Sequence, residues 1–101
     1  MRTWKATVEG SHHTIQIAHD AIFDGDLEIY VDGNQIFENV IPIGQDINHE
    51  FEIDGKPCLV RIQYAGSNLG GGMVHMGCTY EVLVDGKKQE YAGAEPLVSS
   101  D

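Results

Sequence analysis

Basic residues are scarce in this sequence. It holds six lysines and arginines against 16 aspartates and glutamates, a formal net charge of −10 at pH 7. Proteins that bind nucleic acid or an anionic membrane surface need lysine and arginine side chains to neutralise phosphates. We therefore expect no nucleic-acid partner and no membrane partner. The acidity favours solubility and, among partners, basic or cationic ones.

Long apolar runs are missing too, and there are only two cysteines. No segment approaches the roughly 20 apolar residues that span a bilayer, and residues 1–10 lack the apolar stretch of a secretory signal. Cys58 and Cys78 form neither a disulfide framework nor a Cys-x-x-Cys pair. We expect a cytoplasmic protein with two free, buried thiols.

Helical periodicity is absent as well. No stretch of helix length repeats its apolar residues with a period of about 3.6, so we expect essentially no helix. The chain has 101 residues, of which 42% are hydrophobic, and this suits one globular domain with one core. We place that domain at residues 1–93 and a flexible tail at 94–101, where Pro96 and small polar residues gather.

The clearest element is a β-hairpin at Leu27–Phe37. Leu27, Ile29 and Val31 alternate with polar or amphipathic residues, the period of a half-buried strand. Asp32-Gly33 then supplies a residue pair that accepts the positive φ angles of a tight turn. The same pair recurs at residues 54–55 and 85–86, so the chain is predicted to be rich in hairpins.

Further alternating runs complete an all-β chain. About eight strands with a turn signal every ten residues or so are typical of an antiparallel sandwich or barrel, and we favour a β-sandwich. Phe23 is expected to anchor its loop in the core, and His49 to face the apolar side of its strand. The expected strands are Trp4–Val8, His13–His19, the two strands of the Leu27–Phe37 hairpin, Ile47–Ile53, Pro57–Ala65, Met73–Val84 and Lys87–Ala92.

The acidic loop Asp20–Asp26 resembles the centre of a calcium-binding loop. Aligning Gly25 with the turn glycine of an EF-hand puts Val31 at the twelfth position, which requires a bidentate glutamate. The flanking segments are strands, not helices. The EF-hand interpretation therefore fails, and an adventitious surface cation site is what remains for this loop.

Five histidines are the other candidate ligands. His13 and His19 share one strand face, but a zinc site needs further ligands from other strands. Without a Cys/His spacing pattern, turn and strand-end histidines are the favoured interpretation. A small-molecule or metal-binding domain that uses the histidines and the Asp20–Asp26 loop is the alternative. The remaining three histidines are His12, His49 and His75.

No catalytic constellation can be assembled. Cys58 and Cys78 lie mid-strand with inward parity, and Glu50 and Glu52 are expected on a solvated strand face. The glycine-rich stretch Gly66–Gly72 lacks the Gly-Lys-Ser/Thr ending of a phosphate loop and is expected to be a mobile hairpin loop. We predict no enzyme activity, no catalytic residue, no cofactor and no metal.

Several short motifs, in order along nearly the whole chain, resemble the Fas apoptotic inhibitory molecule family. The most specific are the Gly/His/Ile/His strand and the repeated Val-Asp-Gly turns. The matching residues are Trp4, Gly10-x-x-His13-x-Ile15-x-x-x-His19, Ile29-Tyr30-Val31-Asp32-Gly33, Ile43-Gly44 before Phe51-x-Ile53, Cys58, and Tyr80-Glu81-Val82-Leu83-Val84-Asp85-Gly86-Lys87.

This resemblance implies a compact antiparallel β-sandwich without known catalytic activity. Animal members of the family carry two such domains and are linked to protection from cell death and to suppression of protein aggregation. By that resemblance we expect a protein-binding domain that protects against aggregation. Exposed sheet edges and the Gly66–Gly72 loop are the expected contact regions, because unpaired strands accept another strand. A monomer or weak homodimer is expected.

Overall fold

A computed structural model describes residues 1–20, 23–64 and 78–94, and every regular element within them is a β-strand. These residues contain no helix that is long and apolar enough to cross a membrane. The strands are β1 (Arg2–Val8), β2 (Ser11–His19), β3 (Asp26–Val31), β4 (Asn34–Val40), β5 (Ile47–Ile53), β6 (Lys56–Tyr64), β7 (Cys78–Val84), β8 (Lys87–Lys88) and β9 (Glu90–Ala94).

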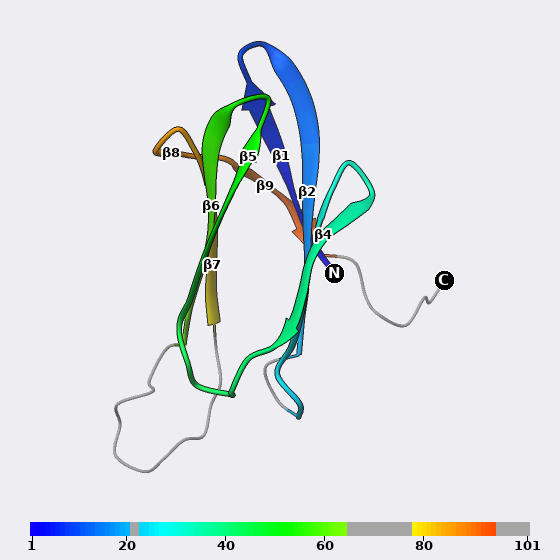
Figure 1. Cartoon of the computed structure of the whole chain (residues 1–101), viewed down its shortest axis with the longest axis vertical. Coiled ribbons are helices and arrows are strands. Elements are labelled where there is room, and N and C mark those ends of the chain that lie inside the picture. Colours follow the sequence, from blue (N-terminus) through cyan, green and yellow to red (C-terminus); the bar gives the residue numbers. More distant parts are fainter. Residues whose placement is uncertain (21–22, 65–77, 95–101) are drawn as a thin grey trace.

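The strands form two antiparallel sheets that pack face to face (Figure 1). Sheet A has the order β4-β3-β2-β1-β9 and sheet B the order β5-β6-β7-β8. The predicted all-β, hairpin-rich antiparallel sandwich is confirmed. Each sheet is built mainly from sequential hairpins, as the repeated Asp-Gly pairs indicated.

Four tight turns lie towards one end of the sandwich (Figure 1). At the β3–β4 turn, Asp32 and Gly33 have φ angles of 52° and 84°, the left-handed pair that a two-residue hairpin requires. The predicted turns at residues 54–55 and 85–86 have the same backbone form, and so does the turn at residues 9–10. The turn predictions are therefore confirmed.

The core lies between the two sheets and takes one residue in two from the central strands. Ile15, Leu27 and Val60 are fully buried, and no polar or charged residue is buried among the described ones. Fully burying a side chain of this size contributes about 1.5–3 kcal/mol, so this alternation supplies most of the driving force. The buried set is Trp4, Ala6, Val8, Ile15, Ile17, Leu27, Ile29, Ile47, Ile53, Cys58, Val60, Ile62, Val82 and Val84.

The predicted strand Lys87–Ala92 was wrong as a single element. Its first two residues are β8, which pairs with Leu83 and Val84 of β7, whereas β9 pairs with β1 in the other sheet. The chain changes sheets at Gln89, whose N–H donates to the Val82 carbonyl and whose Oε1 accepts from Thr7 N–H at 3.0 Å. A strand of only two lysines is too short to show the alternation of apolar and polar residues from which strands are predicted.

Phe23 does not anchor the core, contrary to expectation, since it is 84% exposed. The Phe23 N–H donates to Asp20 Oδ1 at 2.9 Å. The loop is instead held by its backbone, because the Ile41 N–H donates to the Gly25 carbonyl at 2.9 Å. Ile41, not Phe23, packs on the core from this region.

Several predictions concern residues that lie wholly or partly outside the described ranges. Of the predicted strand Met73–Val84, residues 78–84 form β7 and the rest lies outside the described residues. Gly66–Gly72 and His75 also lie outside them, as do residues 95–101 of the expected tail. Ala94, the first residue of that expected tail, is the last residue of β9 and pairs with Arg2.

Candidate functional site

The candidate site is the side of the sandwich where β4 and β5 lie next to each other. β4 is the last strand of sheet A on this side, and β5 is the last strand of sheet B. The rings of Phe37 on β4 and His49 on β5 are 4.1 Å apart between their centroids, so the two edges are in contact. We call this side, with its residues Ile36, Phe37, Val40, Ile43, His49 and Phe51, the β4–β5 edge.

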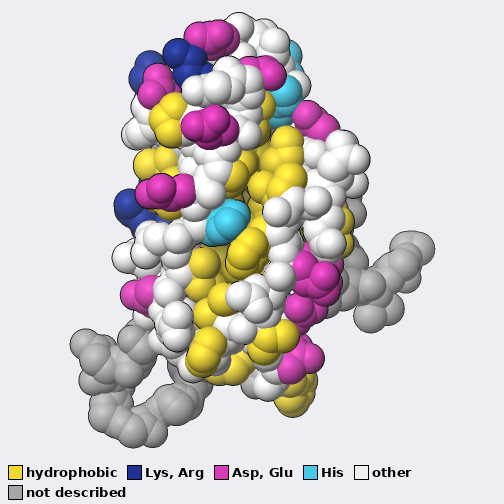
Figure 2. All heavy atoms as spheres, in the orientation of Figure 1, with side chains coloured by type: hydrophobic (Ala, Val, Ile, Leu, Met, Phe, Trp, Pro, Cys, Tyr) yellow, Lys and Arg dark blue, Asp and Glu magenta, His cyan; other side chains and the backbone are white. Residues whose placement is uncertain are grey.

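Apolar side chains are unusually exposed along this edge. Val40 is 63% exposed, and Ile36 and Ile43 are each more than two-fifths exposed. Figure 2 shows hydrophobic side chains gathered along the seam between the two sheets, with acidic side chains around them. Scattered exposed apolar residues are normal, but a group on an edge strand marks a surface suited to a partner.

Among the described residues, no strand pairs with the outer side of β4. The bond from Ile41 N–H to Gly25 O sets the ladder with β3, and in an antiparallel pair alternate residues direct their N–H and C=O away from the partner strand. Glu38 and Val40 are the outward residues by this alternation. The Asn39 Oδ1 atom accepts from Val40 N–H at 2.8 Å and so covers one of these groups.

A β-bulge at Ile36 decides which side chains of β4 face the core. The turn at Asp32-Gly33 pairs Tyr30 with Gln35, but the next pairs are Ile29 with Phe37 and Glu28 with Glu38, so Ile36 is the extra residue. The bulge turns Phe37 inwards against the core and leaves Ile36 exposed. A bulge of this kind adds twist to an edge strand and re-aims its side chains.

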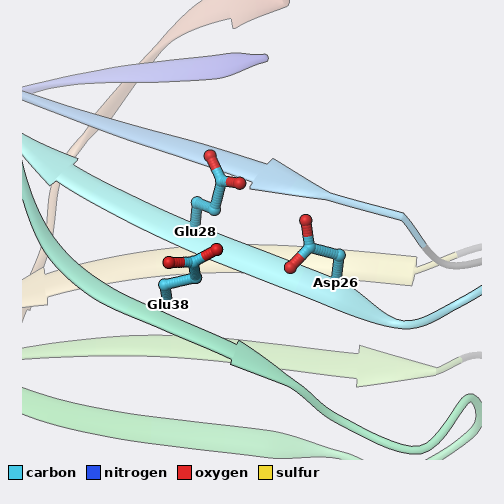
Figure 3. A group of neighbouring side chains, drawn as sticks. All are labelled: Asp26, Glu28 and Glu38. Carbon is cyan, nitrogen blue, oxygen red and sulfur yellow. The ribbon is translucent and has the colours of Figure 1, made fainter.

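The same bulge assembles three carboxylates on the outer face of β3 and β4. Figure 3 shows Asp26, Glu28 and Glu38 together on that face, and one ligand atom from each lies within 4.8 Å of the others. Such a group attracts a divalent cation or the lysine and arginine side chains of a partner. No imidazole or thiol belongs to this group of described residues, so it is not a zinc-type site.

The neighbouring groups change the pKa of one of these carboxylates. Partial desolvation, together with the carboxylates of Glu28 and Asp24, raises the pKa of Asp26. The Tyr30 hydroxyl donates to Glu28 Oε1 at 2.6 Å, and Gln35 Nε2 donates in turn to the Tyr30 oxygen. Closely spaced carboxylates repel one another, so a cationic side chain at this face would be stabilised.

The four histidines among the described residues do not converge on one site. His13 and His19 both point between the sheets from β2, six positions apart, which corresponds to about 20 Å along a strand. His49 lies on β5, His12 is exposed, and His75 is outside the described residues. Among the described residues the predicted alternative of a shared histidine metal site therefore has no geometric support.

His13 joins turns of the two sheets. Its Nδ1 atom is 2.7 Å from Asp32 Oδ2, and its Nε2 atom is 3.5 Å from Asp54 Oδ2, without the geometry of a hydrogen bond. The hydrogen bond to Asp32 is the main reason why the pKa of His13 is raised. The same bond and the Thr14 N–H lower the pKa of Asp32.

His19 occupies the other end of β2 and contacts the opposite sheet. Its Nδ1 is 2.8 Å from the Tyr80 hydroxyl, and its Nε2 is 3.3 Å from the Tyr64 hydroxyl. A neutral imidazole satisfies both contacts by donating through one nitrogen and accepting through the other. Burial lowers the pKa of His19, in keeping with a neutral ring.

His49 has the orientation predicted from its strand. It faces the apolar side of β5, where it lies between Phe37 and Phe51, with a centroid distance of 6.0 Å to the latter. Burial among these rings lowers its pKa. It therefore packs as part of the seam between the two sheets and is not a candidate base or ligand.

The two cysteines are free, as predicted. Cys58 is fully buried and Cys78 is partly buried, and desolvation raises the pKa of both thiols. A thiol with a raised pKa is a poor nucleophile because little thiolate is present. Glu50 and Glu52 are exposed on β5, as expected for a solvated strand face.

A separate hollow lies on the outer face of sheet B. It has a volume of about 530 Å³, an apolar floor that includes Leu59 and Leu83, and acidic walls at Glu50 and Glu52. Arg61 at its margin already pairs with Glu81 at 3.3 Å. No group of convergent polar atoms there indicates chemistry, so we do not take this hollow as the site.

Sequence reasoning anticipated exposed edges but missed the acidic face and the exposed β4 residues. The two-residue turn by itself pairs Glu28 with Phe37, and only the bulge brings Glu28 opposite Glu38. The one available signal was that each strand of the hairpin carries a glutamate, Glu28 in the first and Glu38 in the second. No protein-family model matches this chain, and no curated protein sequence matches it either.

Proposed function

We propose that this protein is a binding domain, not an enzyme, and that it holds extended segments of other proteins by strand addition at the β4–β5 edge. The observation that carries the proposal is the open outer side of β4 beside exposed Ile36, Val40 and Ile43. An extended segment bonded to this edge gains backbone hydrogen bonds and covers these side chains.

The size of the surface favours weak and reversible binding. Covering the exposed parts of three aliphatic side chains contributes about 2–4 kcal/mol, and each new backbone hydrogen bond adds about 0.5–1.5 kcal/mol. Association costs at least about 4 kcal/mol in lost freedom of motion. Several hydrogen bonds along β4 are therefore required before any complex forms.

Charge selects the kind of segment. Glu28 and Glu38 lie on the outer face beside β4, and Glu50 and Glu52 lie on the outer face of β5. A segment that alternates apolar residues with lysine or arginine would cover the seam and pair with these carboxylates. Two copies of β4 placed edge to edge would bring like charges together, which favours the monomer that we propose.

The resemblance to the Fas apoptotic inhibitory molecule family supports the same function. Proteins that suppress aggregation must contact exposed apolar strands of partly unfolded chains, and strand addition is the direct way to cover such a strand. We propose that the β4–β5 edge gives this protein that protective activity.

The test is light scattering of a heat-stressed client protein with and without this protein. Wild type should delay aggregation of the client. Val40→Lys, which places a cation on the exposed edge, should lose most of the delay. Thr79→Lys makes the same charge change at an exposed position of β7, across the sandwich, and should keep it. No delay with wild type, or equal activity of both folded variants, contradicts the proposal.

A further inference from the structure

A second cavity lies on the side of the sandwich away from the β4–β5 edge. It has a volume of about 290 Å³ and is lined by Arg2, Trp4, Cys78, Tyr80 and Tyr91. These residues come from β1 and β9 of sheet A and from β7 of sheet B. The cavity is therefore independent of the proposed protein-binding edge.

The change of sheet at Gln89 leaves room for this cavity. β8 pairs only with Leu83 and Val84, so in the described part of the chain the first half of β7 has no strand on that side. The next strand, β9, has already crossed to β1 (Figure 1). A gap between β7 and β9 follows, and the side chains of Trp4 and Tyr80 face it.

Aromatic rings form the walls. The Trp4 ring is buried and lies 5.0 Å from the Tyr91 ring and 6.4 Å from the Tyr80 ring, measured between centroids. Tyr91 is 48% exposed, so the flat wall that it provides can be reached from solvent. The Tyr80 hydroxyl is held by His19 Nδ1 at 2.8 Å, which fixes the ring on that side.

Arg2 supplies a positive charge at the cavity. Its guanidinium carbon lies 4.3 Å from the centre of the Tyr80 ring, and none of the ion pairs between described residues includes it. A guanidinium is planar, always charged, weakly hydrated, and matched to the two oxygens of a carboxylate. Its position on Tyr80 disfavours a cationic ligand, because the cation site of that ring is taken.

We propose that this cavity binds a small carboxylate with a flat aromatic body. The carboxylate would pair with Arg2, and the ring would lie against Trp4 and Tyr91. Ligand pockets of this kind are mostly apolar, with a few polar groups that orient the ligand, and start at about 300 Å³. Cys78 is only a wall residue here, since burial raises the pKa of its thiol.

The single tryptophan of the chain makes the test direct, because Trp4 lines the cavity. Phenylacetate, titrated into the ¹⁵N-labelled protein, should shift the Trp4 indole N–H resonance saturably. Phenylacetamide has the same shape without the charge and should bind at least about tenfold more weakly. No saturable shift at millimolar phenylacetate, or equal binding of the amide, overturns the proposal.

Two variants test whether the guanidinium of Arg2 is the group that binds the carboxylate of the ligand. Arg2→Gln should weaken phenylacetate binding by about tenfold or more, since a charge-assisted hydrogen bond is worth about 1.5–3 kcal/mol. Lys5→Gln removes the same charge from the exposed face of β1 and should bind as wild type does. Equal weakening by both variants overturns the role of Arg2. If Arg2→Gln does not fold, the comparison of acid and amide on wild type still decides the proposal.

Discussion

Histidines that point between the sheets experience opposite environments, depending on what each one touches. His13 meets two aspartates at the end with the tight turns, and these raise its pKa. His19 and His49 are enclosed by aromatic rings, and burial lowers their pKa. The fold therefore favours the charged form of histidine at one place and the neutral form at two others.

This difference predicts opposite pH dependences for two variants. Because the pKa of folded His13 lies above its unfolded value, its contribution is complete below the unfolded pKa of about 6.5 and is lost as pH rises through the folded pKa. His13→Gln should therefore cost more free energy of unfolding at about pH 5 than at about pH 8. Urea titrations at the two pH values measure this.

His49→Gln is the matched comparison. Its folded pKa is lowered, so its contribution is complete above the unfolded pKa and is lost as pH falls through the window below about 6.5. The cost of this variant should be larger at about pH 8 than at about pH 5. Costs that change with pH in the same direction for both variants would contradict the assigned environments.

Gly25 is required for the contact that holds the β2–β3 loop. It has a φ of +73°, and a Cβ atom at this position would collide with the Ile41 carbonyl oxygen. Gly25→Ala should lower the free energy of unfolding by about 3 kcal/mol. Gly10→Ala, at a φ of +84° with open space around the Cβ position, should cost only about 1 kcal/mol. Thermal or urea unfolding compares them, and equal costs would argue against the close approach.

At the scale of elements, the β-bulge of β4 has the largest effect on the candidate site. It places Phe37 inwards, Ile36 outwards and Glu38 opposite Glu28. Alternation and turn chemistry predicted the β3–β4 hairpin itself, since Asp32-Gly33 and the residues before it carry both signals. They do not predict the bulge, which depends on how Phe37 packs against β5. The sequence therefore could not predict which face of the sheet each β4 side chain would occupy.

Asn39 acts as a partial block on the β4 edge. Its Oδ1 atom accepts from Val40 N–H, a group that a docking strand would need. Asn39→Ala should therefore strengthen the binding of extended segments and lengthen the delay of client aggregation. Asn34→Ala makes the same change at the first residue of β4, leaves Val40 N–H bonded, and should behave as wild type does. A shorter delay with Asn39→Ala would contradict this role.

At the scale of the molecule, the sandwich follows from features that the sequence shows plainly. Alternating apolar residues and left-handed Asp-Gly pairs are local signals, and they specify most strands and their hairpin pairing. The crossing at Gln89 and the exposed position of Phe23 depend on contacts between distant segments. Both the β4–β5 edge and the Arg2 cavity arise from such contacts, and so neither could be derived from local patterns.

Amide hydrogen exchange in the presence of a short peptide tests the central claim most directly. The peptide alternates valine with lysine, and a control peptide alternates valine with glutamate. The lysine peptide should slow exchange at the amide of Glu38, which points away from β3 at the open edge of β4, and the glutamate peptide should not. Protection confined to β7 or β9, or equal protection by both peptides, would contradict binding at the β4–β5 edge.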